Sequence, residues 1–283
     1  MKKISLLLTY VLISSILTPS YTQKYGGPQP LSFNTVSSKA AQGNIKADVS
    51  IEYPSTGASY TFLNGYCSIL NDRLSEIVSP VLDENDTKEL QLTTDVSKTA
   101  DAVANFFTDE ALNFQRRSFY ESLDEDDPSP QVFDPEECLP CELTLNCEKL
   151  YSNYHFASFG NFGYIYLGGA HGMPITDIYT ITREDGKMVE LEDVFPPATH
   201  NKLKAIVYRN LLKEFDGDES ALWEDASTKL PDAMGFALLK EGVRFQYDAY
   251  EIGPYAIGTP TCTVPYSQLT SIMTSKAKRW LRN

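Results

Sequence analysis

The residues best suited to chemistry lie in two glycine-rich segments that each end a strand-like aromatic run. The first segment is Gly168-Gly169-Ala170-His171-Gly172, and the second is Tyr250-Glu251-Ile252-Gly253-Pro254-Tyr255. Each places one ionisable side chain, His171 or Glu251, where glycine lets the backbone turn sharply. We predict that the two segments contribute to one binding site, formed by Gly169, His171, Tyr250, Glu251, Pro254 and Tyr255.

The same histidine raises the question of catalysis or metal binding. A histidine base needs a nucleophile and an orienting acid within hydrogen-bond reach. The sequence contains no Gly-x-Ser-x-Gly elbow and no His-Glu-x-x-His pair, and His155 and His200 are not spaced as co-ligands. We therefore predict no catalytic residue, no metal ligand and no cofactor. Three roles for His171 stay open: stabilising its own turn, contacting a partner, and acting in catalysis or metal binding.

The first 22 residues have the organisation of a secretory signal peptide. Lys2 and Lys3 precede an apolar run from residue 4 to 17, and Pro19 with small residues then suits a cleavage site after Thr22. The apolar run is shorter than the roughly 20 residues that a membrane-spanning helix needs. We predict an exported protein, periplasmic or extracellular, with no membrane span after cleavage; a retained anchor is the alternative.

Composition limits the class of partner. The 283-residue chain is 42% hydrophobic and carries a formal net charge of −14, which is enough material for one large domain or two closely packed ones. An acidic surface repels phosphate groups, so nucleic acid and anionic membranes are poor partners. A cationic protein is instead attracted to it.

Five cysteines, an odd number, leave at least one thiol without an intramolecular partner. Cys138 and Cys141 have the spacing of a redox motif, but the acidic residues beside them oppose thiolate formation. A structural disulfide in the Cys138–Cys147 segment, reaching as far as Cys67, is one interpretation; free thiols and a metal or redox role are the others. Cys262 alternates with apolar strand residues and is predicted to be buried and free.

Hydrophobic periodicity predicts an α+β fold, with an antiparallel sheet packed on helices in two closely packed subdomains. We expect residues 23–43 to form a flexible leader, 44–163 an N-terminal companion domain and 164–283 a C-terminal domain. Leu143, Leu145 and Cys147 alternate with polar residues and indicate a half-buried strand. The other expected elements are strands at 45–53, 60–63, 151–159, 162–167 and 261–264, hairpins around 185–186 and 240–242, and helices starting at 64, 100, 199 and 267.

Several motifs in the C-terminal half carry a family resemblance. They are the Gly-Gly-Ala-His turn at 168–171, Asp185-Gly186-Lys187, Glu192-Asp193-Val194-Phe195, the Tyr-Glu-Ile-Gly-Pro-Tyr run at 250–255, and Pro265-Tyr266. These motifs resemble the exported domain pair of RsiV-like proteins, the ectodomains of lysozyme-sensing anti-sigma factors. The C-terminal domain of that pair, a domain of unknown function, carries the Gly-Gly-Ala-His and Tyr-Glu-Ile-x-Pro-Tyr motifs. The acidic, cysteine-bearing stretch at 121–147 departs from the pattern.

The resemblance implies a secreted or periplasmic binding protein for a cell-envelope ligand. The partner it suggests is a lysozyme-like muramidase, which as a cationic protein suits the acidic chain; a cell-wall glycan is the other candidate. Two alternatives come from different classes of protein. One is a hydrolase of cell-wall glycan or peptide that uses His171, and the other is a structural or adhesive envelope protein.

Overall fold

The structure is a computed structural model that describes residues 29–81, 90, 92, 95–122, 132–233 and 235–282. The predicted signal peptide, residues 1–22, lies outside the described residues. Within these ranges, no helix combines the length and the apolar character that crossing a membrane requires.

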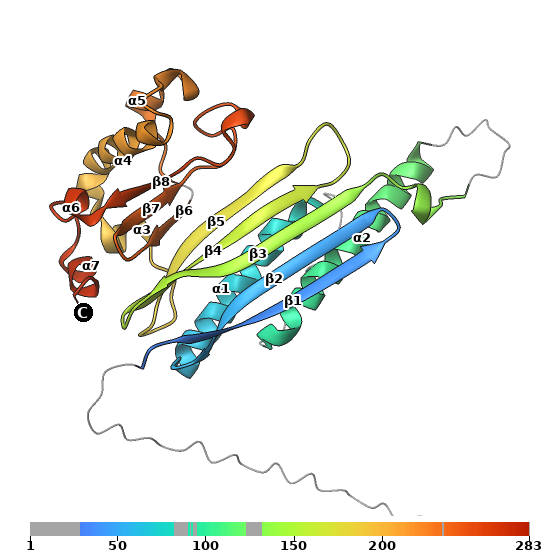
Figure 1. Cartoon of the computed structure of the whole chain (residues 1–283), viewed down its shortest axis with the longest axis horizontal. Helices are drawn as coiled ribbons and strands as arrows, with labels where there is room; N and C mark the ends of the chain where they lie inside the picture. The colour runs from blue at the N-terminus through green and yellow to red at the C-terminus, as the bar shows by residue number, and fades with distance from the viewer. Residues whose placement is uncertain are drawn as a thin grey trace, which may run out of the picture.

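The described residues form two sheets with helices, so the predicted α+β class is confirmed (Figure 1). The larger sheet has the order β1-β2-β3-β4-β5 and the smaller one the order β6-β7-β8. The strands are β1 (Ser32–Gln42), β2 (Ile45–Thr56), β3 (Cys141–Ser152), β4 (Phe156–Tyr166), β5 (Met173–Thr182), β6 (Gly235–Leu238), β7 (Gly242–Gln246) and β8 (Thr261–Pro265). The helices are α1 (Tyr60–Val78), α2 (Thr99–Glu121), α3 (Leu191–Val194), α4 (His200–Glu214), α5 (Ala226–Lys229), α6 (Tyr266–Leu269) and α7 (Ser275–Trp280).

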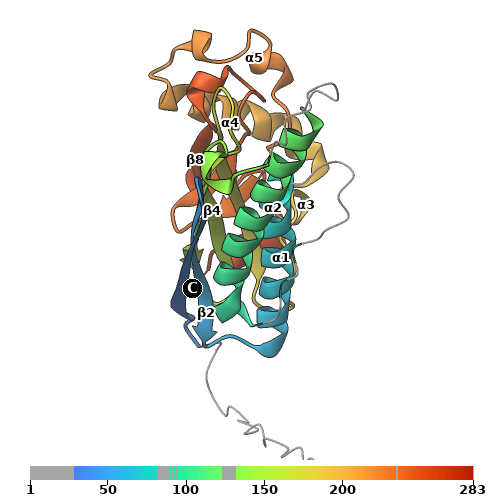
Figure 2. The ribbon, with the colours of Figure 1, turned by 90° about the vertical axis from the view of Figure 1, so that its right-hand side faces the viewer.

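The larger sheet is mixed, not purely antiparallel as predicted. Strands β2 and β3 run parallel, with Val49 opposite Leu145, while the other neighbours in this sheet are antiparallel. A parallel pair needs a crossover connection, and here the connection carries α1 and α2. Figure 2 shows these two helices side by side along the same face of the sheet.

Helix α1 begins earlier than the sequence predicted. Ser59 caps it by accepting a hydrogen bond from the Phe62 backbone N–H at 3.1 Å. Phe62, Tyr66 and Leu70 then follow at four-residue spacing and are buried against the sheet. The prediction of a strand at residues 60–63 and of a helix start at Asn64 was therefore wrong.

The larger sheet differs from three further predictions. Residues 23–43 are not a leader throughout, because β1 occupies 32–42 and pairs antiparallel along β2. The strands predicted at 151–159 and 162–167 are largely one strand, β4, with Gly160 in its interior under the Phe162 ring. The predicted boundary between residues 163 and 164 falls inside β4. The buried residues of the larger core come from Ile45 to Ile181, and those of the second core come from Val189 onward together with Phe156 of β4.

The smaller sheet has its own core and joins the larger one through β6. Ile206, Val207 and Leu211 of α4 pack in this second core with residues of β7 and β8. On the face of β4 and β5 opposite the helices, Ser158 Oγ donates to the Leu238 carbonyl at 2.6 Å, and the Leu238 N–H donates to Thr180 Oγ1 at 3.0 Å. Buried polar contacts of this kind fix one register of packing between the two subdomains.

All five cysteines are buried, and none of them forms a disulfide bond. This confirms the burial predicted for Cys262, of which 2% is exposed. The disulfide considered for the Cys138–Cys147 segment is not formed, and Cys138 and Cys141 are both buried. Burial raises the pKa of the Cys141 thiol, and Gln115 Nε2 lies 3.2 Å from its sulfur.

A largely buried carboxylate beneath the helices gives a pH-dependent prediction. Burial raises the pKa of Asp177, which the nearby Arg73 guanidinium and the Asn161 amide offset only in part. Because the folded pKa is raised, the contribution of Asp177 to stability is fully present below its unfolded value of about 3.9 and is lost as the pH rises through the folded pKa. We expect Asp177→Asn to gain stability relative to wild type as the pH rises above about 4, measured by urea unfolding. A wild-type-to-variant difference that stays constant with pH would contradict this.

Candidate functional site

The structure brings the two predicted segments together. The loop at 167–172 joins β4 to β5, and the loop at 247–260 joins β7 to β8, so the two come from different sheets. The His171 and Tyr255 rings lie with centroids 4.3 Å apart and planes inclined by 31°. The Tyr255 hydroxyl donates to the Gly172 carbonyl at 2.5 Å. The two loops are thus joined by a ring contact and a hydrogen bond.

Two aromatic residues that the sequence did not single out extend this contact. The Trp223 indole N–H donates to the Tyr250 carbonyl at 3.2 Å, and the Tyr250 and Tyr255 ring centroids lie 5.5 Å apart. On the other side, Tyr164 Oη accepts from the Gly172 N–H at 2.9 Å. We call this set the aromatic strip: Tyr164, His171, Trp223, Tyr250 and Tyr255.

Much of the aromatic strip faces solvent. Tyr250 is 50% exposed, Trp223 45% and Tyr164 38%, and His171 is also exposed. A run of exposed aromatic groups over adjoining loops is typical of an interaction surface. Trp223 could have been flagged as one of only two tryptophans, whereas Tyr164 is one of several aromatic residues in its strand and carried no distinguishing signal.

The two loops have the conformations that glycine permits and that local hydrogen bonds hold. Gly168 and Gly169 have φ values of 81° and 147°, which residues with a Cβ rarely adopt. Tyr166 Oη donates to the Gly169 carbonyl at 2.9 Å and lies 3.2 Å from its N–H. Tyr250 itself has a φ of 70°, which is a strained conformation for an aromatic residue.

Glu251 stabilises its own loop. One of its carboxylate oxygens accepts from the Asp248 N–H at 2.9 Å, and its own N–H donates to the Asp248 carbonyl at 3.1 Å. Burial raises the pKa of Glu251. Pro254 is exposed and precedes the short 3₁₀ helix η6 (Tyr255–Ile257). Gly169 and Glu251 therefore shape the loops, while His171, Tyr250 and Pro254 are accessible to a partner.

The geometry around His171 is that of a ring contact. Its Nδ1 lies 3.2 Å from the carbonyl oxygen of the neighbouring Gly172, and the ring packs on Tyr255. Among the described residues, no group of three or more histidine, cysteine and acidic side chains is placed to hold a metal ion. The residues around His171 offer flat aromatic faces and hydrogen-bonding groups, which are the kinds of group that bind a partner molecule.

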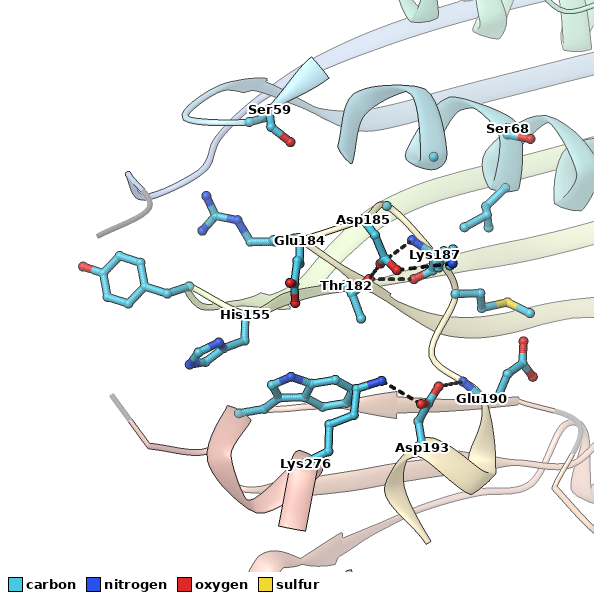
Figure 3. Close-up of a pocket in the computed structure, with 18 of the residues that line it drawn as sticks. Ser59, Ser68, His155, Thr182, Glu184, Asp185, Lys187, Glu190, Asp193 and Lys276 are labelled. Carbon is cyan, nitrogen blue, oxygen red and sulfur yellow. Dashed lines mark hydrogen bonds and ion pairs between the residues drawn. The ribbon is translucent and has the colours of Figure 1, made fainter. Parts of the chain in front are cut away.

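A separate cavity of about 1140 Å³ lies at the opposite end of β5 (Figure 3). It is enclosed by the start of α1, the turn from Arg183 to Glu190, the loop between β3 and β4, and α7. The Gly186 carbonyl would lie only 1.9 Å from a Cβ at Gly65, so the turn packs closely on α1 beside the cavity. The sequence predicted the turn at Asp185-Gly186 but not the cavity, because its lining residues come from five separate segments with no shared motif.

The chain was compared with known proteins. Residues 192–267 match the family model described as "Protein of unknown function (DUF3298)". The chain is 25% identical over 114 residues to the peptidoglycan-N-acetylmuramic acid deacetylase PdaC of Bacillus subtilis (strain 168); the match covers 39% of this chain and 24% of the relative. The chain thus spans about a quarter of the length of this curated relative.

Two crystal structures of DUF3298 family proteins share the fold. One, from Pseudomonas aeruginosa PAO1, is 18% identical in sequence and has a TM-score of 0.57. The match covers 89% of this chain and 98% of the Pseudomonas chain. The other, from Bacteroides fragilis NCTC 9343, is 13% identical in sequence and has a TM-score of 0.59. The match covers 89% of this chain and 96% of the Bacteroides chain. The finer resemblance to RsiV-like proteins stays a prediction. Residues 192–267 therefore resemble the DUF3298 family, and the fold of the chain is similar to that of two solved members of that family.

Proposed function

We propose that this chain is an exported binding protein for a cell-envelope ligand and that the aromatic strip is its contact surface. The observation that carries the proposal is the contact between His171 and Tyr255, which joins loops from the two sheets into one exposed surface. Because both loops are held by their own hydrogen bonds, little order needs to be gained on binding.

The side chains of the strip are of the kind that dominate binding energy. Tyrosine and tryptophan supply large contact areas at a low cost in conformational entropy. Tyr250 and Trp223 are half exposed, and Pro254 adds a rigid apolar surface between Tyr250 and Tyr255 along the chain. A partner that covers this surface would bury these groups together.

The ligand we propose is a lysozyme-like muramidase. The net charge of −14 favours a cationic protein, and a relative named as a peptidoglycan deacetylase supports a role at the cell wall. The predicted signal peptide at residues 1–22 supports export. The resemblance to RsiV-like proteins supports the choice of a muramidase over other cationic proteins.

Substitution of Tyr255 gives the direct test. Calorimetric titration with a purified cationic lysozyme is expected to show binding that Tyr255→Ala weakens about 30-fold or more, a loss typical of a central aromatic anchor. Binding is also expected to weaken as the ionic strength rises, because exposed charges are screened. Tyr60→Ala is the matched control, since Tyr60 is 80% exposed and lies at the start of α1, outside the strip.

Three results would contradict the proposal. Absence of binding at low salt, where attraction between opposite charges is strongest, would exclude a lysozyme ligand. Peptidoglycan digestion by the wild-type protein that is lost in a folded His171→Ala variant would favour the hydrolase alternative. Retention of the chain on insoluble envelope material, without binding of soluble lysozyme, would favour the adhesive one.

A further inference from the structure

The cavity at the far end of β5 is separate from the aromatic strip, and we propose that it binds a neutral oligosaccharide. Strand β5 has ten residues, so at about 3.3 Å per residue the two regions lie on the order of 30 Å apart. The inference does not depend on the proposed function, since it concerns different residues and a different ligand.

The volume suits a ligand larger than a single small molecule. At about 1140 Å³ the cavity exceeds the roughly 300–1,000 Å³ of ordinary ligand pockets. It is open to solvent and bounded by both subdomains. An elongated chain of sugar rings could lie between α1 and the turn on one side and α7 on the other.

Two of the cationic side chains that line the cavity already have acidic partners within it. Lys276 Nζ lies 2.8 Å from Asp193 Oδ1, and Lys187 Nζ lies 3.5 Å from Asp185 Oδ2 (Figure 3). Asp185 also accepts hydrogen bonds from Thr182 and from the Lys187 N–H. An anionic ligand would have to compete with Asp193 and Asp185 for these lysines and would be repelled by both carboxylates, which disfavours phosphate or carboxylate as the recognised group.

The third cation, Arg183, is occupied by backbone carbonyls. Its Nη1 donates to the Asn153 carbonyl at 2.7 Å, and its Nη2 donates to the carbonyls of Gln29 at 2.7 Å and Gly57 at 2.9 Å. The guanidinium thus joins three segments at the edge of the cavity. It holds the shape of the site and is not available as a docking point for an anion.

The remaining lining groups suit hydroxyl and amide ligands. Glu184 is exposed and has no ion-pair partner among the described residues. Its side chain extends from the turn into the space between the turn and α7, the helix that carries Lys276 (Figure 3). His155 borders the same space. Tyr154 provides exposed aromatic surface, and the partly buried Ile69 and Met188 provide apolar surface. Hydrogen-bonding groups between flat apolar faces match the alternating hydroxyl edges and C–H faces of a sugar chain.

The test uses defined neutral oligosaccharides and the full chain. We expect calorimetry to detect saturable binding of chitotetraose or cellotetraose at concentrations up to about 10 mM, the range in which weak binding is measurable. Because the ligand is uncharged, raising NaCl from about 50 mM to about 500 mM is expected to leave its affinity unchanged. Glu184→Ala is expected to weaken binding about tenfold, as loss of a charge-assisted hydrogen bond does, and Tyr154→Ala is expected to weaken it as well.

The controls separate this cavity from the aromatic strip. Glu192→Ala removes the same charge from a nearby exposed position that does not line the cavity, and Tyr250→Ala alters only the strip; both are expected to bind the sugars normally. Tetralysine and tetraglutamate test for charged ligands. The inference is overturned if neither sugar binds, if either peptide binds more tightly than both sugars, or if Glu184→Ala and Tyr154→Ala leave sugar binding unchanged.

Discussion

Gly65→Ala is expected to lower the free energy of unfolding by roughly 2–3 kcal/mol, the usual range for forcing an extra group into a packed site. This loss of stability is opposite in sign to the effect of helix propensity, which favours alanine over glycine by about 1 kcal/mol inside a helix. The new Cβ would lie 1.9 Å from the Gly186 carbonyl oxygen and 2.7 Å from its Cα, and both of these are backbone atoms that cannot rotate away. The melting temperature measured by circular dichroism should fall by roughly 5–10 °C.

Asn64→Ala is the matched control for this variant. Asn64 is the preceding residue of α1 and is exposed, so alanine there is expected to raise stability by about 0.5 kcal/mol through helix propensity. If Asn64 were the cap of the helix, the same substitution would instead cost about 1 kcal/mol. A Gly65→Ala protein as stable as wild type would show that the turn and α1 do not pack as described.

Trp280→Ala is expected to cost roughly 3–5 kcal/mol, the range for truncating a large buried aromatic residue. Trp280 is 8% exposed, and its ring centroid lies 6.4 Å from that of Phe156 in β4. Its carbonyl accepts from Asn153 Nδ2 at 3.1 Å. These contacts attach the C-terminal helix α7 to the larger sheet. The variant should therefore have weaker packing between the two subdomains. Urea unfolding followed by circular dichroism measures the change.

Trp223→Ala provides the comparison, since the chain has only two tryptophans. Trp223 is 45% exposed, so its truncation is expected to change stability by no more than about 1 kcal/mol. Its effect should appear instead in binding at the aromatic strip. Equal destabilisation by the two substitutions would contradict the assignment of Trp280 to the core and Trp223 to the surface.

Local sequence patterns predicted those elements whose structure depends mainly on residues nearby in the chain. Leu143, Leu145 and Cys147 alternate with polar residues, and the structure buries the first set and exposes the second, as predicted. The hairpin of β6 and β7 also follows from its own turn residues. Strand β1 was missed because only one of its faces packs, through Val36 and Ala40, and the rest of its sequence is as polar as a loop.

Long-range features were not predictable in the same way. The parallel pairing of β2 with β3 depends on how two helices cross the sheet, which no pattern within either strand encodes. The two glycine-rich turns suggested the residues of one site, but the contact of His171 with Tyr255 and the position of Trp223 beside Tyr250 arise only in the tertiary fold. The cavity depends wholly on how separate segments meet, and its residues have no common spacing.

The parallel β2–β3 pair also determines the order in which the chain can fold. Strand β1 can pair with β2 as soon as both are made, because only a tight turn separates them. The other edge of β2 stays unpaired until α1, α2 and finally β3 have been synthesised. Closing so long a loop is slow, and pairing of this kind places folding in the millisecond-to-second range typical of non-local sheets. Until then the β1–β2 hairpin presents an open edge on which a second chain could pair, so early folding is the stage most exposed to aggregation.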